Sequence, residues 1–134
     1  MTHAPRNLKF TREHEWVRVK GHALVVGMTD FAQHQLSHII NVDMPAPDEH
    51  HHYEAGDEVG VLESVKAAAD FHTPVSGIVT AVNAELLHAA ELINSDPYGA
   101  GWLFQMKPDD IADIEELMDV DAYEASLPDE NNEE

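Results

Sequence analysis

Several short stretches of the chain alternate between apolar and polar residues, a period of two that is typical of β-strands with one buried face. The alternation predicts strands over 15–19, 39–44, 57–64, 68–73, 78–83 and 102–106. A short apolar run predicts one more strand over 23–28. Turn-forming residues separate many of them, such as Gly21 after the first and the sequence PVSG before 78–83. The pattern predicts a mainly β fold.

The alternation also predicts which side chains face the core. Ile40 should share a buried face with Val42, and Trp102 should share one with Phe104 and be substantially buried. The segment 45–56, by contrast, is polar and rich in turn formers. We expect it to be an exposed loop.

Helical spacing is confined to short segments beside these strands. Thr29 is a good N-cap for a helix over 30–39. After Pro108, the apolar residues of 111–118 recur three or four apart, and 122–127 can form another short helix. The fold class expected is therefore mainly β with short flanking helices and a C-terminal helical segment.

Composition and charge narrow the class of protein. The chain has 134 residues, 43% of them apolar, and no cysteine, which favours one domain over 1–128 without disulfides. The acidic end, 129–134, is too polar to order itself. No apolar run approaches the ~20 residues of a membrane span. A formal charge of −19 argues against nucleic-acid binding. We expect a cytoplasmic monomer.

Lys66 has an unusual setting for so acidic a chain. It is one of four lysines, yet Val65 precedes it and Ala67 follows it, and it lies in a link of three residues between two predicted strands. Such a link is a tight turn, so the side chain should project into solvent from a hairpin tip. Solvated turns more often carry Gly, Asn, Asp or Ser than apolar residues. These observations alone leave Lys66 open as either a surface lysine or a functional one.

The motifs around Lys66 resemble those of the glycine cleavage system H protein family. The similarity comprises REHEWVRV, VGMTDFAQ, ESVKAAAD, PVSG and NSDPYGAGWL, which follow one another between Phe10 and Tyr123. The resemblance implies a flattened hybrid of barrel and sandwich, of the lipoyl and biotinyl carrier type, with the lysine at a hairpin tip. It also implies that Lys66 carries lipoate in amide linkage and that the protein is a carrier rather than an enzyme.

The resemblance implies partners and further site residues as well. The protein would be the aminomethyl carrier that shuttles a lipoyl-bound intermediate and reducing equivalents between glycine decarboxylase, aminomethyltransferase and dihydrolipoyl dehydrogenase. Glu63 would be recognised by the lipoate-attaching enzyme. Asp70 and His72, on the strand that leaves the tip, are candidates for lining a cleft that holds the loaded arm. The chemistry itself would be the cofactor's.

One segment departs from the family pattern. Ser37 and His38 stand where the family usually has Gly-Asp, and the loop that follows is longer and rich in histidine and acid. This leaves open a second client: H-like proteins carry lipoate for sulfur oxidation with a heterodisulfide-reductase-like complex. A non-lipoylated adaptor also stays open, whereas a biotinyl carrier does not fit, because methionines do not flank Lys66.

Histidines in the same segment invite a metal interpretation. His34 and His38 are four apart on the predicted helix, and the run 48–52 joins two acids to three histidines. Consecutive residues of a flexible loop rarely converge on one ion without supporting contacts. We therefore predict a solvated, pH-sensitive loop and no metal site.

Overall fold

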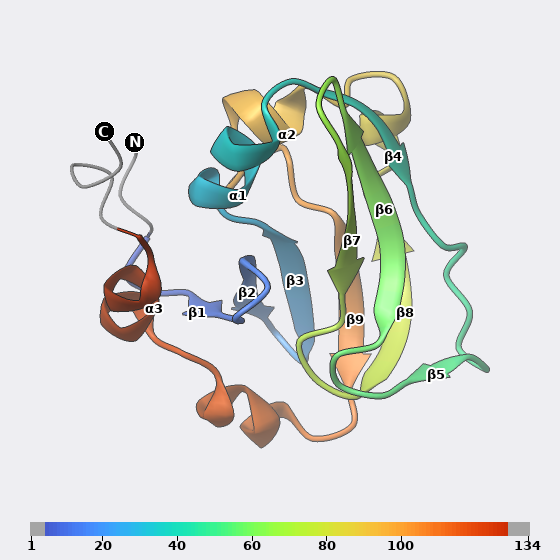
Figure 1. The fold of residues 1–134 in the computed structure, drawn as a ribbon. Helices are drawn as coiled ribbons and strands as arrows, with labels where there is room; N and C mark the ends of the chain where they lie inside the picture. Colours follow the sequence, from blue (N-terminus) through green and yellow to red (C-terminus); the bar gives the residue numbers. More distant parts are fainter. Residues whose placement is uncertain (1–4, 129–134) are drawn as a thin grey trace.

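Two β-sheets face each other in the computed structural model, which describes residues 5–128 (Figure 1). The larger sheet has the order β1-β2-β3-β9-β8-β5 and the smaller one the order β4-β6-β7. The strands are β1 (Lys9–Phe10), β2 (Glu15–Lys20), β3 (Ala23–Met28), β4 (Ile39–Asp43), β5 (His52–Tyr53), β6 (Glu58–Ser64), β7 (Ala68–His72), β8 (Gly77–Val82) and β9 (Phe104–Pro108). The paired strands are antiparallel. This is the predicted mainly β hybrid of barrel and sandwich.

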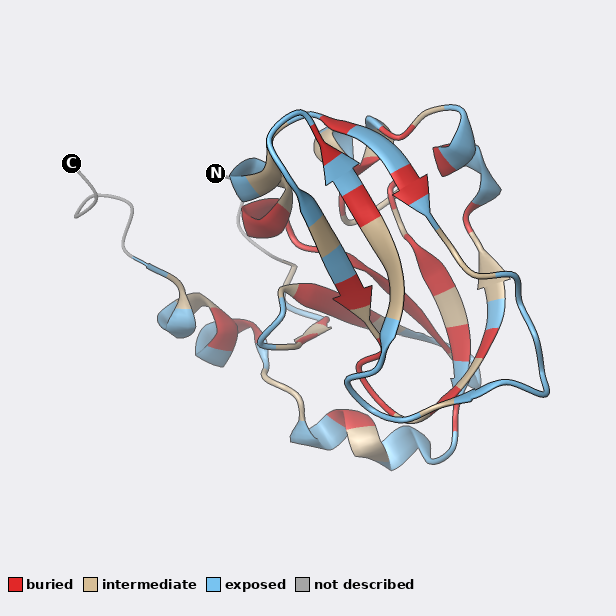
Figure 2. Cartoon of the chain, turned by 45° about the vertical axis from the view of Figure 1, so that its right-hand side comes forward, coloured by how far each residue is buried: buried red, intermediate tan, exposed pale blue. Residues whose placement is uncertain are grey.

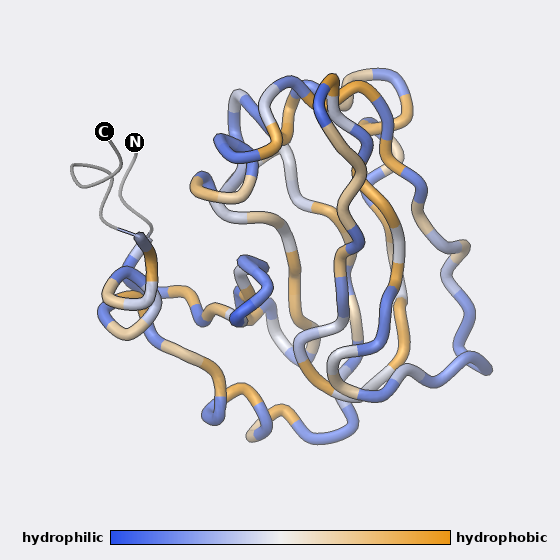
Figure 3. Tube along the Cα trace, in the orientation of Figure 1, coloured by the Kyte–Doolittle hydropathy of each residue, from blue (hydrophilic) through white to orange (hydrophobic). Residues whose placement is uncertain are grey.

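Most of the apolar core lies between the two sheets (Figures 2 and 3). Leu24, Leu62, Phe71, Phe104 and Met106 are fully buried there, and the rings of Phe71 and Phe104 stack across the space between the sheets at 6.0 Å. The outer faces of β4, β6 and β7 carry exposed residues (Figure 2). The alternating pattern of these strands is therefore explained by one buried face and one solvated face.

A second apolar cluster closes the N-terminal hairpin against the C-terminal helix. Trp16 and Tyr123 are both buried there, and the Tyr123 ring stacks on Phe10 at 4.6 Å. The indole of Trp16 occupies space that only glycine leaves free, because a Cβ at position 27 would lie 2.5 Å from the Trp16 ring. Trp16 Nε1 donates to the carbonyl of Pro97 at 2.9 Å. Both faces of the first half of β2 are thus covered.

Short helices surround the sheets. They are α1 (Asp30–Leu36), η1 (Ala84–Leu87), α2 (Leu92–Ser95), η2 (Ile111–Glu116) and α3 (Val120–Ser126), where η marks 3-10 helices. Thr29 caps α1 as predicted, its hydroxyl accepting from the N–H of Ala32 at 3.2 Å. None of the helices is long and apolar enough to cross a membrane within 5–128.

One predicted helix boundary and two predicted burial states were wrong. The helix predicted over 30–39 ends at Leu36, because Ser37 takes a positive φ of 68° that turns the chain into β4. Ile40 is 57% exposed instead of buried, since the register of β4 on β6 shifts between Ile39 and Asn41. Trp102 is only half-buried and precedes β9.

The C-terminal parts of the prediction had mixed outcomes. The helical segment after Pro108 forms, but as the 3-10 helix η2 and not as an α-helix, whereas α3 confirms the helix predicted over 122–127 to within two residues. The loop 45–56 is exposed over most of its length and contains the short strand β5. The acidic tail predicted over 129–134 lies outside the described residues.

Candidate functional site

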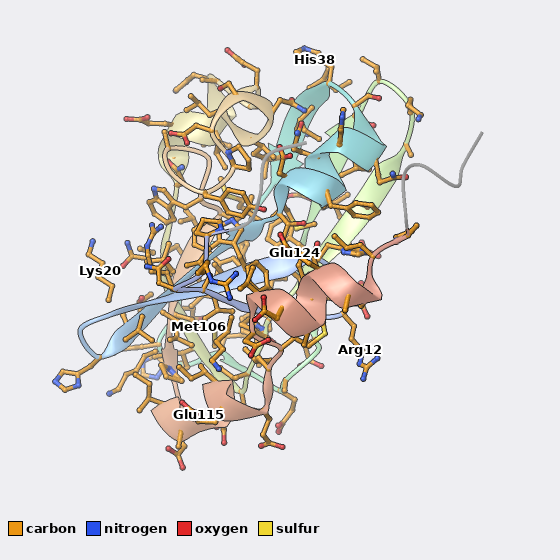
Figure 4. All side chains as sticks on the ribbon, turned by 90° about the vertical axis from the view of Figure 1, so that its left-hand side faces the viewer. Arg12, Lys20, His38, Met106, Glu115 and Glu124 are labelled. Carbon is orange, nitrogen blue, oxygen red and sulfur yellow. The ribbon has the colours of Figure 1, made fainter. Side chains whose placement is uncertain are left out.

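The lysine singled out by its sequence setting lies at the tip of the β6–β7 hairpin. Ser64 ends β6, Ala68 begins β7, and Lys66 is the middle residue of the link between them. Its side chain is exposed, and no residue of 5–128 forms a hydrogen bond or ion pair with its ammonium group. The hairpin reaches the end of the molecule that His38 also occupies, opposite the end that carries Glu115 (Figures 1 and 4). The predicted position of Lys66 is confirmed.

The backbone on either side of Lys66 is held by the Ser64 side chain. Its buried hydroxyl accepts from the N–H groups of Lys66 at 3.1 Å and Ala67 at 3.0 Å, and it donates to the Ala67 carbonyl at 3.1 Å. The Ser64 N–H also donates to that carbonyl, at 2.8 Å. The turn is therefore fixed by local hydrogen bonds, and the lysine side chain extends from a rigid base.

The segment 37–39, which leads into β4, also supports the tip. The Val65 N–H donates to the His38 carbonyl at 3.0 Å. Asn94 of α2 fixes the segment that contains His38, because its amide donates to the Ser37 carbonyl at 2.8 Å and accepts from the Ile39 N–H at 2.9 Å. Asn94 thus connects α2, through a segment of three residues, to the position of Lys66.

Glu63 lies on the exposed face of β6, three residues before Lys66. Asn41 on β4 donates from its side-chain amide to the Glu63 carboxylate at 2.8 Å. This cross-strand bond limits the directions in which the carboxylate can point. Glu63 forms no ion pair with any cation of residues 5–128, so its charge stays accessible beside the tip.

Asp70 and His72 lie further along β7, away from the tip. They lie four and six positions after Lys66, which corresponds to about 13 and about 20 Å along an extended strand. Asp70 is exposed, whereas the His72 side chain is 20% exposed. The structure does not bring either residue into contact with Lys66, and their role in holding a loaded arm stays a prediction.

His72 is bound to a buried carboxylate that the sequence did not single out. Glu15 is fully buried at the start of β2, and its Oε2 lies 3.0 Å from His72 Nδ1 and accepts from the His72 backbone N–H at 2.9 Å. Its other oxygen, Oε1, accepts from the Thr11 hydroxyl at 2.7 Å. Three hydrogen bonds hold this carboxylate in place, and the backbone N–H of Glu15 also donates to the Thr11 hydroxyl oxygen at 3.2 Å.

The pKa values of Glu15 and His72 are both raised. Burial raises the pKa of Glu15 more than the bonds from Thr11 and His72 lower it. Burial acts to lower the pKa of His72, but the hydrogen bond to Glu15 and its negative charge together outweigh that effect. Because Glu15 Oε2 and His72 Nδ1 lie at hydrogen-bond distance, the ionisation of one group depends on the other, and the two titrate as a pair.

An open cavity of about 290 Å³ adjoins this pair. Thr11, Glu15 and His72 line one side of it, and Glu116 and Met118 contribute from the C-terminal segment. It lies at the end of β7 away from Lys66. Charges of both signs line it, because Arg12 and Glu13 also border the cavity.

Three residues that position these groups were not assigned a role from the sequence. Ser64 and Asn94 lie inside the motifs ESVKAAAD and NSDPYGAGWL, so the motifs contained the signal, although nothing in their spacing shows which atoms they bind. Glu15 begins β2, two residues before Val17, and its acidic side chain gave no indication in the sequence that this position is buried.

The histidines of 34–52 do not converge. His34 lies on α1, but His38 comes after that helix has ended, so the two are not on one helical face. His52 Nε2 lies 2.7 Å from Asp109, which attaches the loop to the end of β9, and His51 packs against Tyr53. Within 5–128, no group of three or more His, Asp or Glu side chains is placed to hold a metal ion.

Comparisons with known proteins agree with this geometry. Residues 8–130 match the family described as Glycine cleavage H-protein. The glycine cleavage system H protein of Acinetobacter baumannii is 45% identical over 123 residues, which cover 92% of this chain and 98% of that protein. That of Carboxydothermus hydrogenoformans is 42% identical over 130 residues, covering 97% and 98%.

A solved structure shares the fold. The crystal structure of a glycine cleavage system H protein from Mycobacterium marinum superposes with a TM-score of 0.80 at 30% sequence identity, covering 91% of this chain and 97% of that one. The chain therefore belongs to the glycine cleavage H-protein family.

Proposed function

We propose that the protein is the lipoyl carrier of a glycine cleavage system, with lipoate attached through an amide to Lys66. The observation that supports this most directly is the exposed Lys66 side chain on a turn that Ser64 and His38 hold rigid. The relatives matched over nearly the whole chain are named glycine cleavage system H proteins. A fixed base with a free side chain is what an attached swinging arm needs.

The residues around Lys66 fit a lipoyl group. Amide formation removes the charge of the lysine, so the apolar Val65 and Ala67 suit the modified residue better than the free one. The attached group would supply a disulfide that can be reduced and reoxidised, chemistry that a chain without cysteine cannot supply itself. Ser64 keeps the base of the arm in one place, which raises the effective concentration of its end at a partner's active site.

The protein would act with other proteins and carry no catalytic group of its own. A lipoate-attaching enzyme would modify Lys66 with Glu63 as a recognition element. Glycine decarboxylase, aminomethyltransferase and dihydrolipoyl dehydrogenase would then use the arm in turn. The accessible carboxylate of Glu63, oriented by Asn41, supports the recognition role.

Reconstitution tests the proposal. The unmodified chain is incubated with a lipoate-attaching enzyme, lipoate and ATP, and intact mass with peptide mapping locates the adduct. The modified chain is then added to the three glycine cleavage enzymes, and glycine decarboxylation is measured. We expect one lipoyl group on Lys66 and turnover that requires it. An unmodified chain after exhaustive incubation, as expected for an adaptor, would contradict the proposal.

The relatives do not favour the sulfur-oxidation client. The segment that suggested this client has two parts, which lie at different places in the structure. Ser37 and His38 lie beside the tip, whereas the loop with the three histidines leads to β5 at the edge of the larger sheet (Figure 1). If the lipoylated protein supports little glycine decarboxylation, replacing Ser37-His38 with Gly-Asp should restore the rate, and shortening the loop should not. Turnover like that of an ordinary H protein would remove the remaining support for the second client.

A further inference from the structure

Two exposed aliphatic side chains flank the tip. Val65 is 62% exposed and Ile40 is 57% exposed, the latter on the strand next to β6. Leu87, 62% exposed, lies on η1, which packs against the same strand. Most other large apolar side chains of residues 5–128 are buried, with Val19 and Ile111 as further exceptions, so two exposed aliphatic side chains next to one lysine require an explanation. We call Ile40 and Val65 the apolar rim.

Two features of the backbone keep the side chains of the apolar rim exposed. Ile40 is the extra residue where β4 shifts register on β6, with Ile39 opposite Ser64 and Asn41 opposite Glu63. Such a bulge redirects a side chain that regular alternation would place inside. Val65 is fixed by its N–H bond to the His38 carbonyl. Both side chains are therefore held in solvent beside Lys66 by hydrogen-bonded backbone.

The charge next to the apolar rim points to the chemistry of an occupant. Glu63 is exposed on β6, two residues before Val65, and Asn41 orients its carboxylate. A surface that covers the rim would lie over this carboxylate too. It would therefore combine apolar side chains with a cationic group, in keeping with the formal charge of −19 on this chain.

Reach distinguishes between the enzymes that could cover the rim. An unmodified lysine extends roughly 6 Å from its Cα, as five bonds of about 1.5 Å allow, whereas a lipoylated one extends roughly 15 Å. An enzyme that works on the end of the finished arm can act from a distance. An enzyme that builds the amide must bring its active site to Nζ itself, and so must contact the residues on both sides of Lys66.

We propose that the apolar rim is the docking surface for the lipoate-attaching enzyme; this rests on the proposed function. In the step that it supports, Nζ of Lys66 attacks the carbonyl carbon of a lipoyl adenylate. The amide C–N bond forms, the acyl C–O bond breaks, adenylate leaves, and the amine releases a proton to solvent. The rim contributes to binding before this step, and Glu63 adds an ionic contact beside it.

Modification kinetics test the rim with matched controls. Ile40→Ser with Val65→Ser is compared with Val19→Ser and with Ile111→Ser, which change aliphatic side chains that are 47% and 40% exposed away from the tip. The unmodified chains are titrated against the lipoate-attaching enzyme with lipoate and ATP, and adduct formation is followed by intact mass. The rim variant should raise KM about tenfold with kcat nearly unchanged, since ground-state contacts are removed, while the controls stay within twofold.

The outcomes separate the two proposals. A wild-type chain that is never modified on Lys66 contradicts the proposed function, and the rim with it. If the wild-type chain is modified and the rim variant shows an unchanged KM, or a fall in kcat alone, then only the docking role of the rim is contradicted. If the variant is modified normally but the glycine cleavage enzymes use its finished arm slowly, the rim binds one of those enzymes. That result also contradicts the proposed docking role. Equal thermal midpoints would show that the variants are folded.

Discussion

The two ends of β7 are built in contrasting ways. At the tip, Ser64 holds Lys66 through hydrogen bonds between residues at most three apart, and the lysine side chain contacts no core. At the other end, His72 is held by Glu15, 57 residues earlier in the chain, and the carboxylate is fully buried. The tip can therefore change its side chain without changing stability, whereas at the buried end ionisation and stability are coupled.

The largest effect expected concerns the tip. Lys66→Arg should abolish lipoylation completely, because a guanidinium cannot form the amide, and it should leave the thermal midpoint unchanged, because the exposed side chain buries little area. Intact mass after incubation with the lipoate-attaching enzyme checks the first point, and a thermal melt checks the second. An adduct on Lys9, Lys20 or Lys107 of this variant would show that the attachment site has been assigned wrongly.

The next effect concerns the buried end. Trp16 is fully buried next to Glu15 on β2, so Trp16→Ala should lower the free energy of unfolding by about 3–5 kcal/mol. Trp102→Ala should cost clearly less, since Trp102 is half-buried and outside β9. Urea unfolding of both variants measures the difference. Equal losses would mean that the burial of the two indoles does not differ as described.

Sequence reasoning predicted most of the strands, the hairpin tip and the position of Lys66, because period-two alternation and turn residues are local signals. It missed Ile40, since one extra residue in β4 reverses which side chain is exposed and the sequence carries no mark of the bulge. It missed Glu15 for a different reason. A buried carboxylate needs partners from distant segments, here Thr11 and His72, and the identity of such partners depends on the tertiary fold.

A smaller effect tests the coupling of ionisation and stability at the buried end. His72→Ala removes one charged partner of Glu15, and at pH 6 it should cost about 1–3 kcal/mol of unfolding free energy, as for a buried polar group that loses a bond. The folded pKa of His72 is raised above its ordinary value of 6.5. Its stabilisation is therefore fully present below pH 6.5 and is lost as the pH rises through the folded pKa.

The difference between variant and wild type isolates the Glu15–His72 pair. Other histidines also titrate: the Asp109 hydrogen bond raises the pKa of His52, and burial lowers that of His14. Their contributions cancel when the cost of His72→Ala is compared at pH 6 and pH 8. That cost should be smaller at pH 8. A cost that grows with pH would mean that the imidazole stabilises the fold in its neutral form.

The smallest effect expected concerns Ser37, in the segment that supports the tip. Ser37 has φ 68° and ψ −150°, a region that is populated almost only by glycine, and its backbone is held there by bonds to Gln33 and Asn94. Ser37→Gly should therefore stabilise the protein by about 1 kcal/mol, because strain of this kind costs of order 1–3 kcal/mol and the added flexibility of glycine offsets part of the gain.

Gln35→Gly is the matched control for Ser37→Gly. Gln35 is exposed, lies two residues earlier and is within α1, so glycine there should destabilise by about 1 kcal/mol. Opposite signs at two neighbouring positions, measured by urea unfolding, would attribute the gain to backbone conformation and not to the loss of a side chain. The His38 carbonyl keeps its bond to Val65 in either variant, so lipoylation of Lys66 should keep its rate. A loss of stability in Ser37→Gly would show that the serine side chain, and not backbone strain, matters at this turn into β4.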